Sequence, residues 1–367
     1  MTWTSVLARR DTGAPIGELG GFRDRKVRHA FNGRAKTASG TLRLDNPLVD
    51  TVLGGSVLLK AYDGATLRFV GPLQSFEETA SGDGGSVAVT FADPLAVFLG
   101  KRLVGKSSAG YVDGDALNTR DRSTLVTNLL AAANASAYTH VDAGTVVATG
   151  SSSYLNLGPY ANALAGITGV VNTLNGPDVE LVLQEPQAVA AGLRYGLLNV
   201  APVIGTVRSD VVFEYGYGRR NVASYRRAGD LSIMLNRAYG LPSTADTAAS
   251  VVTASDAASI TAWDVLEDVV PSDLGTDALR QATVDEHVRI RKAPRVLVSF
   301  SPVRNDVARP GRVPQYGADF NLGDVVRFRA VSQTRSVRVD ALLRVYAVDW
   351  TIDNEGASVP EFTLTAD

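Results

Sequence analysis

Short runs that alternate apolar and polar residues dominate the first part of the chain. Stretches such as GTLRLDNP and SVLLKAYDGATLRFVG have a period of two, which predicts β-strands that bury one face. Asp63-Gly64, between two such runs, predicts a two-residue hairpin turn. Because many short strands leave edges that must be paired, we expect residues 1–105 to form a β-barrel or a β-sandwich.

The pattern becomes helical over residues 106–205. DRSTLVTNLLAAANA predicts a helix with Asp121 or Ser123 as its N-cap, and YANALAGITGVVNTLNG predicts a second helix that Gly176 ends. PDVELVLQEP then predicts a strand. We therefore expect a small α+β domain, separated from the first region by the polar stretch GKSSAGYVDGDALNTRDRS.

The last part of the chain returns to short apolar runs. We expect strands at 211–215 and 231–235 and a loop at 243–259. GTDALRQATVDEHVRIRKAP predicts a helix that Pro294 stops. This part therefore has a mostly β pattern that is interrupted by a helical insertion around residues 260–292.

Two similar strings, one near each end of the chain, suggest an internal duplication. LGGSVLLKA occupies residues 53–61 and LGDVVRFRA occupies residues 322–330. Each is followed by a hairpin, and each region closes on a similar strand, VTFAD at 89–93 and FTLTAD at 362–367. A duplicated barrel is the favoured interpretation, and two unrelated hairpins are the alternative.

The second string also makes a prediction about its two faces. Side chains alternate along a strand, so Val326 and Phe328 should lie in the core. Arg327 and Arg329 should then face solvent or a neighbouring subunit.

The resulting fold class is mainly β, with α+β elements. Two related tube-like β-barrel domains, residues 1–105 and 206–367, are expected on either side of the helix-containing α+β domain at 106–205. A chain of 367 residues is long enough for two or more domains, and 45% hydrophobic residues are sufficient to fill their cores.

Composition excludes several classes of function. A formal net charge of −2 gives no overall attraction to nucleic acid or to an anionic membrane. The absence of cysteine excludes disulfides and thiolate chemistry. MTWTSVLARRDTG lacks the apolar core of a signal peptide, and no apolar run is long enough to span a bilayer, so neither secretion by the ordinary route nor membrane insertion is expected.

Candidate metal sites are weak. His29, His140 and His287 are far apart and none stands in a zinc-binding spacing, so surface or satisfied histidines are expected. Asp113, Asp115 and Asn118 in GYVDGDALN suggest a calcium loop but lack the glycine and terminal glutamate of an EF-hand. A polar linker is the preferred interpretation there.

Candidate catalytic groups are equally weak. In each of the three adjacent pairs, Glu77-Glu78, Glu267-Asp268 and Asp285-Glu286, the two side chains point in different directions, so none of these pairs can flank a sugar ring. There is no G-x-S-x-G motif, and three histidines give no convincing triad. We predict no catalytic, cofactor-binding or metal residues and no cofactor, although a pair formed by distant carboxylates stays open.

The most basic local stretch interleaves arginine with tyrosine: Tyr215, Tyr217, Arg219, Arg220, Tyr225, Arg226 and Arg227. Such a mixture can bind a phosphate backbone or stack on bases. The preferred interpretation is a strand face with paired arginines at a joint between subunits.

Three segments carry a family resemblance. LRLDNPLVDTVLGGSVLLKAYDGATLRFVGPLQSFEE resembles the first barrel of a phage tail hub, and YLNLGPYANALAGITGVVNTLNGPDVELVL resembles the segment inserted before the second barrel. GDLSIMLNRAYG and YGADFNLGDVVRFRA resemble the second barrel. By its order of parts, the chain resembles the minor tail proteins, or baseplate hub (tail-associated) proteins, of long-tailed actinobacterial phages.

The resemblance implies a structural, non-enzymatic virion protein. It implies a homotrimer that caps the distal end of the tail tube and contacts the distal tail, tail-tip and tape-measure proteins, with DNA only in transit. Three chains with two barrels each present six similar units, which can dock onto a sixfold ring. Many such proteins continue into a peptidase or fibre, whereas this sequence stops at Asp367, so those activities are expected in other proteins.

Two alternatives stay open. One is a β-rich receptor- or carbohydrate-binding module of the tail tip, for which Tyr215, Tyr217 and Trp263 are the aromatic candidates. The other, less favoured, is a cell-wall hydrolase.

Overall fold

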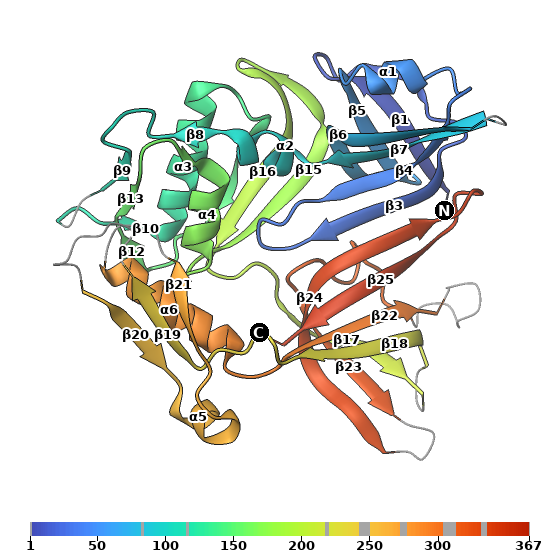
Figure 1. The fold of residues 1–367 in the computed structure, drawn as a ribbon. Coiled ribbons are helices and arrows are strands. Elements are labelled where there is room, and N and C mark those ends of the chain that lie inside the picture. The colour runs from blue at the N-terminus through green and yellow to red at the C-terminus, as the bar shows by residue number, and fades with distance from the viewer. Residues whose placement is uncertain are drawn as a thin grey trace.

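The computed structural model is dominated by β-strands (Figure 1). It describes residues 2–81, 84–114, 117–216, 220–241, 250–271, 277–303, 313–331 and 336–366. A mainly β fold, as the alternating pattern predicts, is confirmed. No helix in these ranges is long and apolar enough to cross a membrane.

The first β region is formed by residues 3–92. Its elements are β1 (Trp3–Arg9), β2 (Pro15–Glu18), β3 (Arg23–Ala30), β4 (Thr37–Arg43), α1 (Val49–Leu53), β5 (Val57–Asp63), β6 (Thr66–Ser81) and β7 (Gly84–Ala92). The predicted hairpin lies between β5 and β6, where Gly64 takes a positive φ of 60°. Only glycine adopts that conformation without a steric cost.

The second β region is built from the last third of the chain. Its elements are β17 (Val207–Tyr215), β18 (Val222–Asp230), β22 (Arg295–Pro302), β23 (Val325–Val331), β24 (Val337–Ile352) and β25 (Ser358–Thr365).

The two regions repeat one strand order. Neighbouring strands run β1-β5-β6-β7-β4-β3 in the first region and β17-β23-β24-β25-β22-β18 in the second. When the six strands of each region are numbered by their position along the chain, with β2 left out, both sheets have the order 1-4-5-6-3-2. They differ in one pairing, because β1 is antiparallel to β5 whereas β17 is parallel to β23.

A shared irregularity strengthens this equivalence. β6 and β24 are each 16 residues long and pair first with the preceding strand and then with the following one. Each has a bulge at the changeover, at Gln74 between Leu73 and Ser75 and at Tyr346 between Val345 and Ala347. The repeat therefore extends to the position of the bulge. In the register that the bulges set, Leu59 rather than Val57 is the counterpart of Val326, so the two similar strings are displaced by two residues, which keeps the same faces inward.

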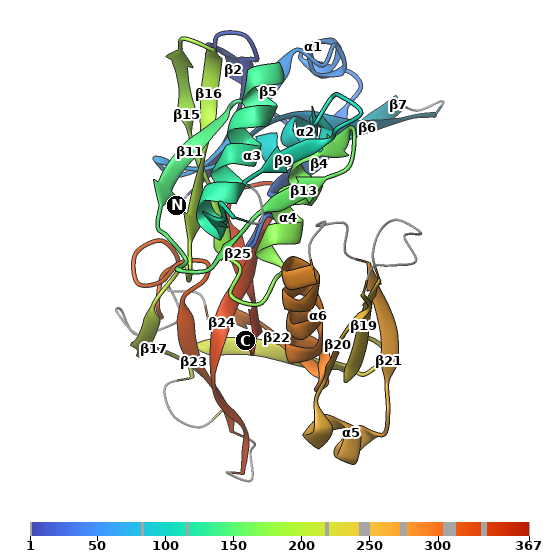
Figure 2. The same ribbon diagram turned by 90° about the vertical axis from the view of Figure 1, so that its left-hand side faces the viewer.

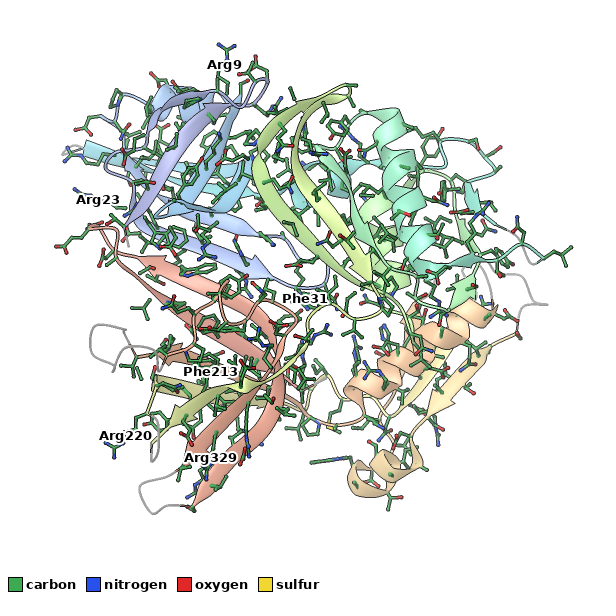
Figure 3. All side chains as sticks on the ribbon, turned by 180° about the vertical axis from the view of Figure 1, so that it is seen from behind. Arg9, Arg23, Phe31, Phe213, Arg220 and Arg329 are labelled. Atoms are coloured by element: carbon green, nitrogen blue, oxygen red, sulfur yellow. The ribbon has the colours of Figure 1, made fainter. Side chains whose placement is uncertain are left out.

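One antiparallel ladder joins the two regions. Residues Ala347–Ile352 of β24 pair with residues Arg25–Ala30 of β3, which makes a single sheet from both ends of the chain (Figure 1). One hydrophobic cluster is continuous beneath it and contains Trp3 and Phe31 as well as Phe213 and Phe328. Figure 3 shows Phe31 and Phe213 inside the molecule, with Arg9, Arg23 and Arg220 at its periphery.

The pairings among the described strands form an open path. It runs from β18 to β2 with β17-β23 as a branch, and no pairing in the described ranges closes either region on itself. The tube-like closure that we expect of two barrels is therefore not present within this single chain.

The segment between the two regions forms a separate α+β layer. Short elements lead into it: α2 (Pro94–Val97), a 3₁₀ turn at Leu99–Lys101, β8 (Leu103–Val104), β9 (Tyr111–Asp113), β10 (Arg120–Asp121), β12 (Ser152–Ser153), β13 (Leu155–Leu157) and β14 (Ala161–Asn162). The main elements are α3 (Arg122–Ser136), β11 (Val141–Val146), α4 (Ala163–Val171), β15 (Asp178–Val189) and β16 (Gly192–Ala201). Figure 2 shows α3 and α4 packed beside the β11-β16-β15 sheet.

The predicted helices of this layer are confirmed, with one correction. Asp121 caps α3 by accepting a hydrogen bond from the Ser123 amide at 2.9 Å. The second helix is shorter than predicted and ends at Val171, so Leu174 and Gly176 lie beyond it. The Leu174 amide instead donates to the Ala282 carbonyl of another element, a tertiary contact that replaces the last helical turn.

A second insertion separates β18 from β22. It contains β19 (Arg237–Leu241), β20 (Val252–Ser255), α5 (Ala257–Trp263), β21 (Glu267–Pro271) and α6 (Asp277–Arg291), with α6 packed on the small sheet. The helix before Pro294 is confirmed.

Two details in this part were predicted wrongly. Residues 231–235 form a turn rather than a strand, because the ladder with β22 ends at Asp230. The expected loop at 243–259 contains β20 and the start of α5, while residues 242–249 lie outside the described ranges.

The buried aromatic centre predicts a large stability effect. Phe328 is completely buried and its ring lies 5.3 Å from that of Phe300. We expect Phe328→Ala to lower the free energy of unfolding by about 3–5 kcal/mol, because a cavity replaces the ring. Leu342→Ala, at a half-exposed position of the neighbouring strand, should change it by less than about 0.5 kcal/mol. Urea denaturation measures both, and equal effects would contradict this view of the core.

Candidate assembly interface

The outer face of β23 carries the two arginines singled out in the sequence. Val326 and Phe328 are fully buried, whereas the side chains of Arg327 and Arg329 are 51% and 40% exposed. This confirms the predicted division of the strand into a core face and an exposed face. Figure 3 shows Arg329 at the edge of the molecule.

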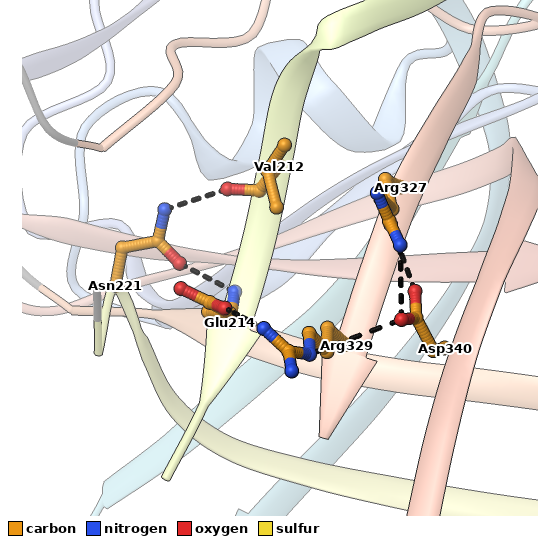
Figure 4. Close-up of polar contacts among 6 residues, drawn as sticks. All are labelled: Val212, Glu214, Asn221, Arg327, Arg329 and Asp340. Carbon is orange, nitrogen blue, oxygen red and sulfur yellow. Dashed lines mark hydrogen bonds and ion pairs between the residues drawn. The ribbon is translucent and has the colours of Figure 1, made fainter. Parts of the chain in front are cut away.

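Carboxylates of the neighbouring strands neutralise these arginines (Figure 4). Arg327 donates two hydrogen bonds to Asp340 of β24, at 2.8 and 2.9 Å, and Arg329 donates to Glu214 of β17 at 3.1 Å. The Glu214 backbone amide in turn donates to Asn221 Oδ1 at 2.7 Å, while the Asn221 side chain donates to the Val212 carbonyl. The hydrogen bonds from Arg327 lower the pKa of Asp340, so the carboxylate stays ionised.

The equivalent face of the first region is covered by the inserted layer. Val57, Leu59 and Ala61 of β5 face the shared core, as Val326, Phe328 and Ala330 do. On the other face Leu58 is fully buried against Leu193 and Tyr195, and Lys60 pairs with Glu185 at 3.1 Å. The same strand motif therefore presents an apolar, covered face in one region and an ionic, exposed face in the other.

The arginine–tyrosine stretch divides between packing and an exposed edge. Tyr215 lies edge-to-face on Tyr225 at 4.9 Å, and Tyr225 packs on Phe328 at 5.6 Å. Arg220 donates to the Gly216 carbonyl at 2.9 Å. Arg226 and Arg227 lie exposed on β18, and Tyr217 and Arg219 lie outside the described ranges.

The histidines are part of the packing. His29 is buried against Trp350, with the ring centroids 5.0 Å apart, and its Nε2 contacts the Arg68 carbonyl. His140 Nδ1 contacts the Leu193 carbonyl. His287 Nδ1 is buried without a partner in the described structure. Among the described residues no three metal-binding side chains come together.

The suggested calcium loop is organised by an ion pair. Asp113 accepts hydrogen bonds from Arg120 Nε at 2.7 Å and from Asn128 at 2.6 Å, one on each carboxylate oxygen. One oxygen thus bonds to β10 and the other to α3. Asp115 lies outside the described ranges.

The three pairs of adjacent carboxylates lie on three different elements, β6, β21 and α6. Glu286 pairs with Arg289 along α6 at 2.7 Å, Asp285 accepts from Gln281 at 2.8 Å, and Glu267 lies 3.6 Å from Arg237. Glu77 and Glu78 lie exposed on β6.

Two exposed strand edges are the features that the sequence reading missed. Residues 74–80 of β6 have solvent-exposed side chains on both faces. So do most residues of β18, where Val222 is buried and Tyr225 and Ala228 are half-buried. The signal was present in QSFEETA, where Phe76 is surrounded by polar residues and is 52% exposed. β18 was missed because SYRRAGD has no apolar alternation.

The fold is shared with known tail proteins. A tail protein from Neisseria meningitidis MC58 matches with a TM-score of 0.56 and 13% identity over 100% of this chain and 97% of its own. The 43 kDa tail protein of prophage MuSo2 from Shewanella oneidensis gives 0.61 and 9% over 98% of each chain. Prophage tail protein gp18 from Listeria monocytogenes gives 0.53 and 10% over 99% and 94%.

This chain has the fold of phage tail proteins. No protein-family model matches its sequence, and no curated protein does either. At identities near 10% the likeness establishes the fold alone.

Burial of His29 predicts a pH response. Desolvation, followed by the nearby Lys36 cation, holds the pKa of His29 well below its ordinary value of 6.5. The unfolded chain therefore binds this proton first, so the contribution to stability is complete above about pH 6.5 and is lost as the pH falls below it. NMR titration of the imidazole should give a lower pKa in the folded chain than in urea, and equal values would contradict the buried placement.

Proposed function

We propose that the chain is a structural component of a phage virion, a homotrimeric hub that caps the distal end of the tail tube and connects it to tip proteins. The observation that carries this proposal is the match of its whole length to tail proteins, each covered over 94% or more. Such a hub works through shape and interface burial, without catalytic turnover.

The repeated strand order supports the trimer. One chain contains two equivalent β regions, so three chains supply six similar units, and such a ring can bind a sixfold tube while itself having threefold symmetry. We propose residues 1–105 and 206–367 as the two hub domains and residues 106–205 as the domain between them. Closure of the sheet into a tube would then take place between chains.

The neighbours proposed for this hub are the distal tail protein, other tail-tip proteins and the tape-measure protein. DNA would meet it only in transit. The pairing of Arg327 and Arg329 with carboxylates supports this, because neutralised guanidinium groups add little affinity for phosphates. We place the assembled protein at the tail tip of the virion, after assembly in the host cytoplasm.

The carbohydrate-binding alternative gains no support from the aromatic residues. Tyr215 packs on Tyr225 of the sheet, whereas Trp263 is exposed at the end of α5 in the second insertion. No ring contact joins Tyr215 of β17 with Trp263 of α5 among the described residues, and Tyr217, the third aromatic candidate, lies outside the described ranges.

Cryo-electron microscopy of the tail that contains this chain tests the proposal. We expect three copies in a ring directly below the tail tube, with six similar β regions around the axis. A particle from which the gene is deleted is the control and should lack this density. A single copy, or a location on a peripheral fibre, would contradict the hub and favour the receptor-binding alternative. Peptidoglycan zymography of the purified chain should show no clearing.

A further inference from the structure

The ladder between β24 and β3, here called the internal joint, shows which kind of strand edge each of these two strands pairs with. β24 offers one edge of residues 347–352, and β3 fills it with residues 25–30. β6 is the counterpart of β24 and β18 is the counterpart of β3 in the repeated strand order. Every chain therefore contains a second copy of each half of this joint.

The corresponding edges of β6 and β18 have no partner strand among the described residues. No described strand pairs with β6 beyond Ser75 on the side opposite β7, and β18 is the end of the sheet path. The burial differs accordingly. Val348 and Trp350 are buried at the internal joint, whereas their counterparts Phe76 and Glu78 are exposed. An exposed edge of this length, carrying a large apolar side chain, is typical of a surface that another strand covers.

We propose that β6 of one chain pairs with β18 of a second copy, antiparallel, in the register of the internal joint. This rests on the proposed function only for the number of chains that closes the ring. The occupant is a second copy because the same two edges, in the same topological positions, already pair within one chain.

The register follows from rows of paired residues across the sheet. One row runs Val27, Ala38, Phe91 and Leu73, and its counterpart runs Arg227, Val298, Leu364 and Val345. Leu73 and Val345 both precede the bulge, which aligns the two rows independently of sequence similarity. Counting from these rows, the internal pair Trp350 and Val27 has Glu78 and Arg227 as its counterpart.

The side chains fit that register. Glu78 lies directly opposite Arg227, and Glu77 lies diagonally opposite Arg226 on the other face, so both arginines meet a carboxylate. None of these four side chains has an ion pair with another described residue. The internal joint uses similar chemistry, since Arg28 lies 3.7 Å from Asp349, directly across the ladder.

Phe76 also finds a suitable partner. In this register it lies opposite Gly229, as Val348 lies opposite His29 in the internal joint. A glycine in a strand leaves open space over its backbone, and no atom lies within 4 Å of the position a Gly229 Cβ would occupy. An aromatic ring on the facing strand can cover this space.

Disulfide trapping tests the pairing directly, because the natural chain has no cysteine. Directly opposed residues of an antiparallel ladder lie about 4.5–5.5 Å apart at Cα, within disulfide reach. Upon oxidation, the E78C/R227C variant should form covalent oligomers on a non-reducing gel. E78C/S224C, displaced by three residues, is the matched control and should crosslink at least about tenfold more slowly, because its Cα atoms are beyond about 7 Å.

Disulfide trapping detects transient contacts between chains as well as stable rings. The crosslinking test therefore applies even if the chain is a monomer by mass measurement. Equal crosslinking of both variants, or none, would overturn it. If mass measurement gives a trimer while E78C/R227C fails to crosslink, the hub stands and this pairing is wrong. If E78C/R227C crosslinks specifically but its largest species is not a trimer, the pairing stands and the trimeric hub is wrong.

Charge reversal supplies an independent readout. Glu78→Arg and Arg227→Glu should each reduce the oligomer population at least about tenfold, because like charges then face each other. The double variant should restore it. Both positions are exposed, so the circular dichroism spectrum and melting temperature of each variant should match those of the natural chain. Failure of the double variant to recover assembly would contradict the Glu78–Arg227 contact.

Discussion

The fold depends on the hydrogen-bonded ladder between β24 and β3. A strand edge buried in a protein must have its amides and carbonyls paired, and here the two partners come from opposite ends of the chain. The length of β24 makes this possible, because one edge can hold β23 along its first half and β3 along its second. The aromatic core beneath can then extend from Trp3 to Phe362 without interruption.

Buried cations attach the inserted layer to this sheet. Arg344 of β24 pairs with Asp178 of β15 and also donates to the carbonyls of Ile204 and Gly323. Lys36 donates from its ammonium group to the Leu181 carbonyl, while its amide donates to Asp93. Asp93 is completely buried, and this desolvation raises its pKa to about 6. Removing either Arg344 or Asp178 would leave the other charge without its partner in a largely buried position. The inserted layer is therefore held by contacts that tolerate little displacement.

The two β regions differ in the outer faces of their corresponding strands. The first region places Leu58 under the inserted layer, and the second places Arg327 among carboxylates in water. Their inner faces remain alike because both contribute to one core. Each region therefore has a different outer surface, while the order of the strands in the sheet is the same in both.

Alternation, helix caps and turn residues are local, and these features could be predicted from the sequence. The β5–β6 hairpin at Asp63-Gly64, the start of α3 at Asp121, and the core and solvent faces of Val326 and Arg327 all follow from the chemistry of neighbouring residues. β18 and the end of α4 could not be predicted in this way. β18 is a strand because β22 supplies its hydrogen bonds, and α4 stops early because Leu174 bonds to α6. The candidate interface also could not be predicted from local sequence. Glu78 and Arg227 are far apart in the sequence, and only the long-range strand pairing gives them the positions that correspond to the two sides of the internal joint. In such pairing the partner strand, rather than the residue's own propensity, sets the conformation.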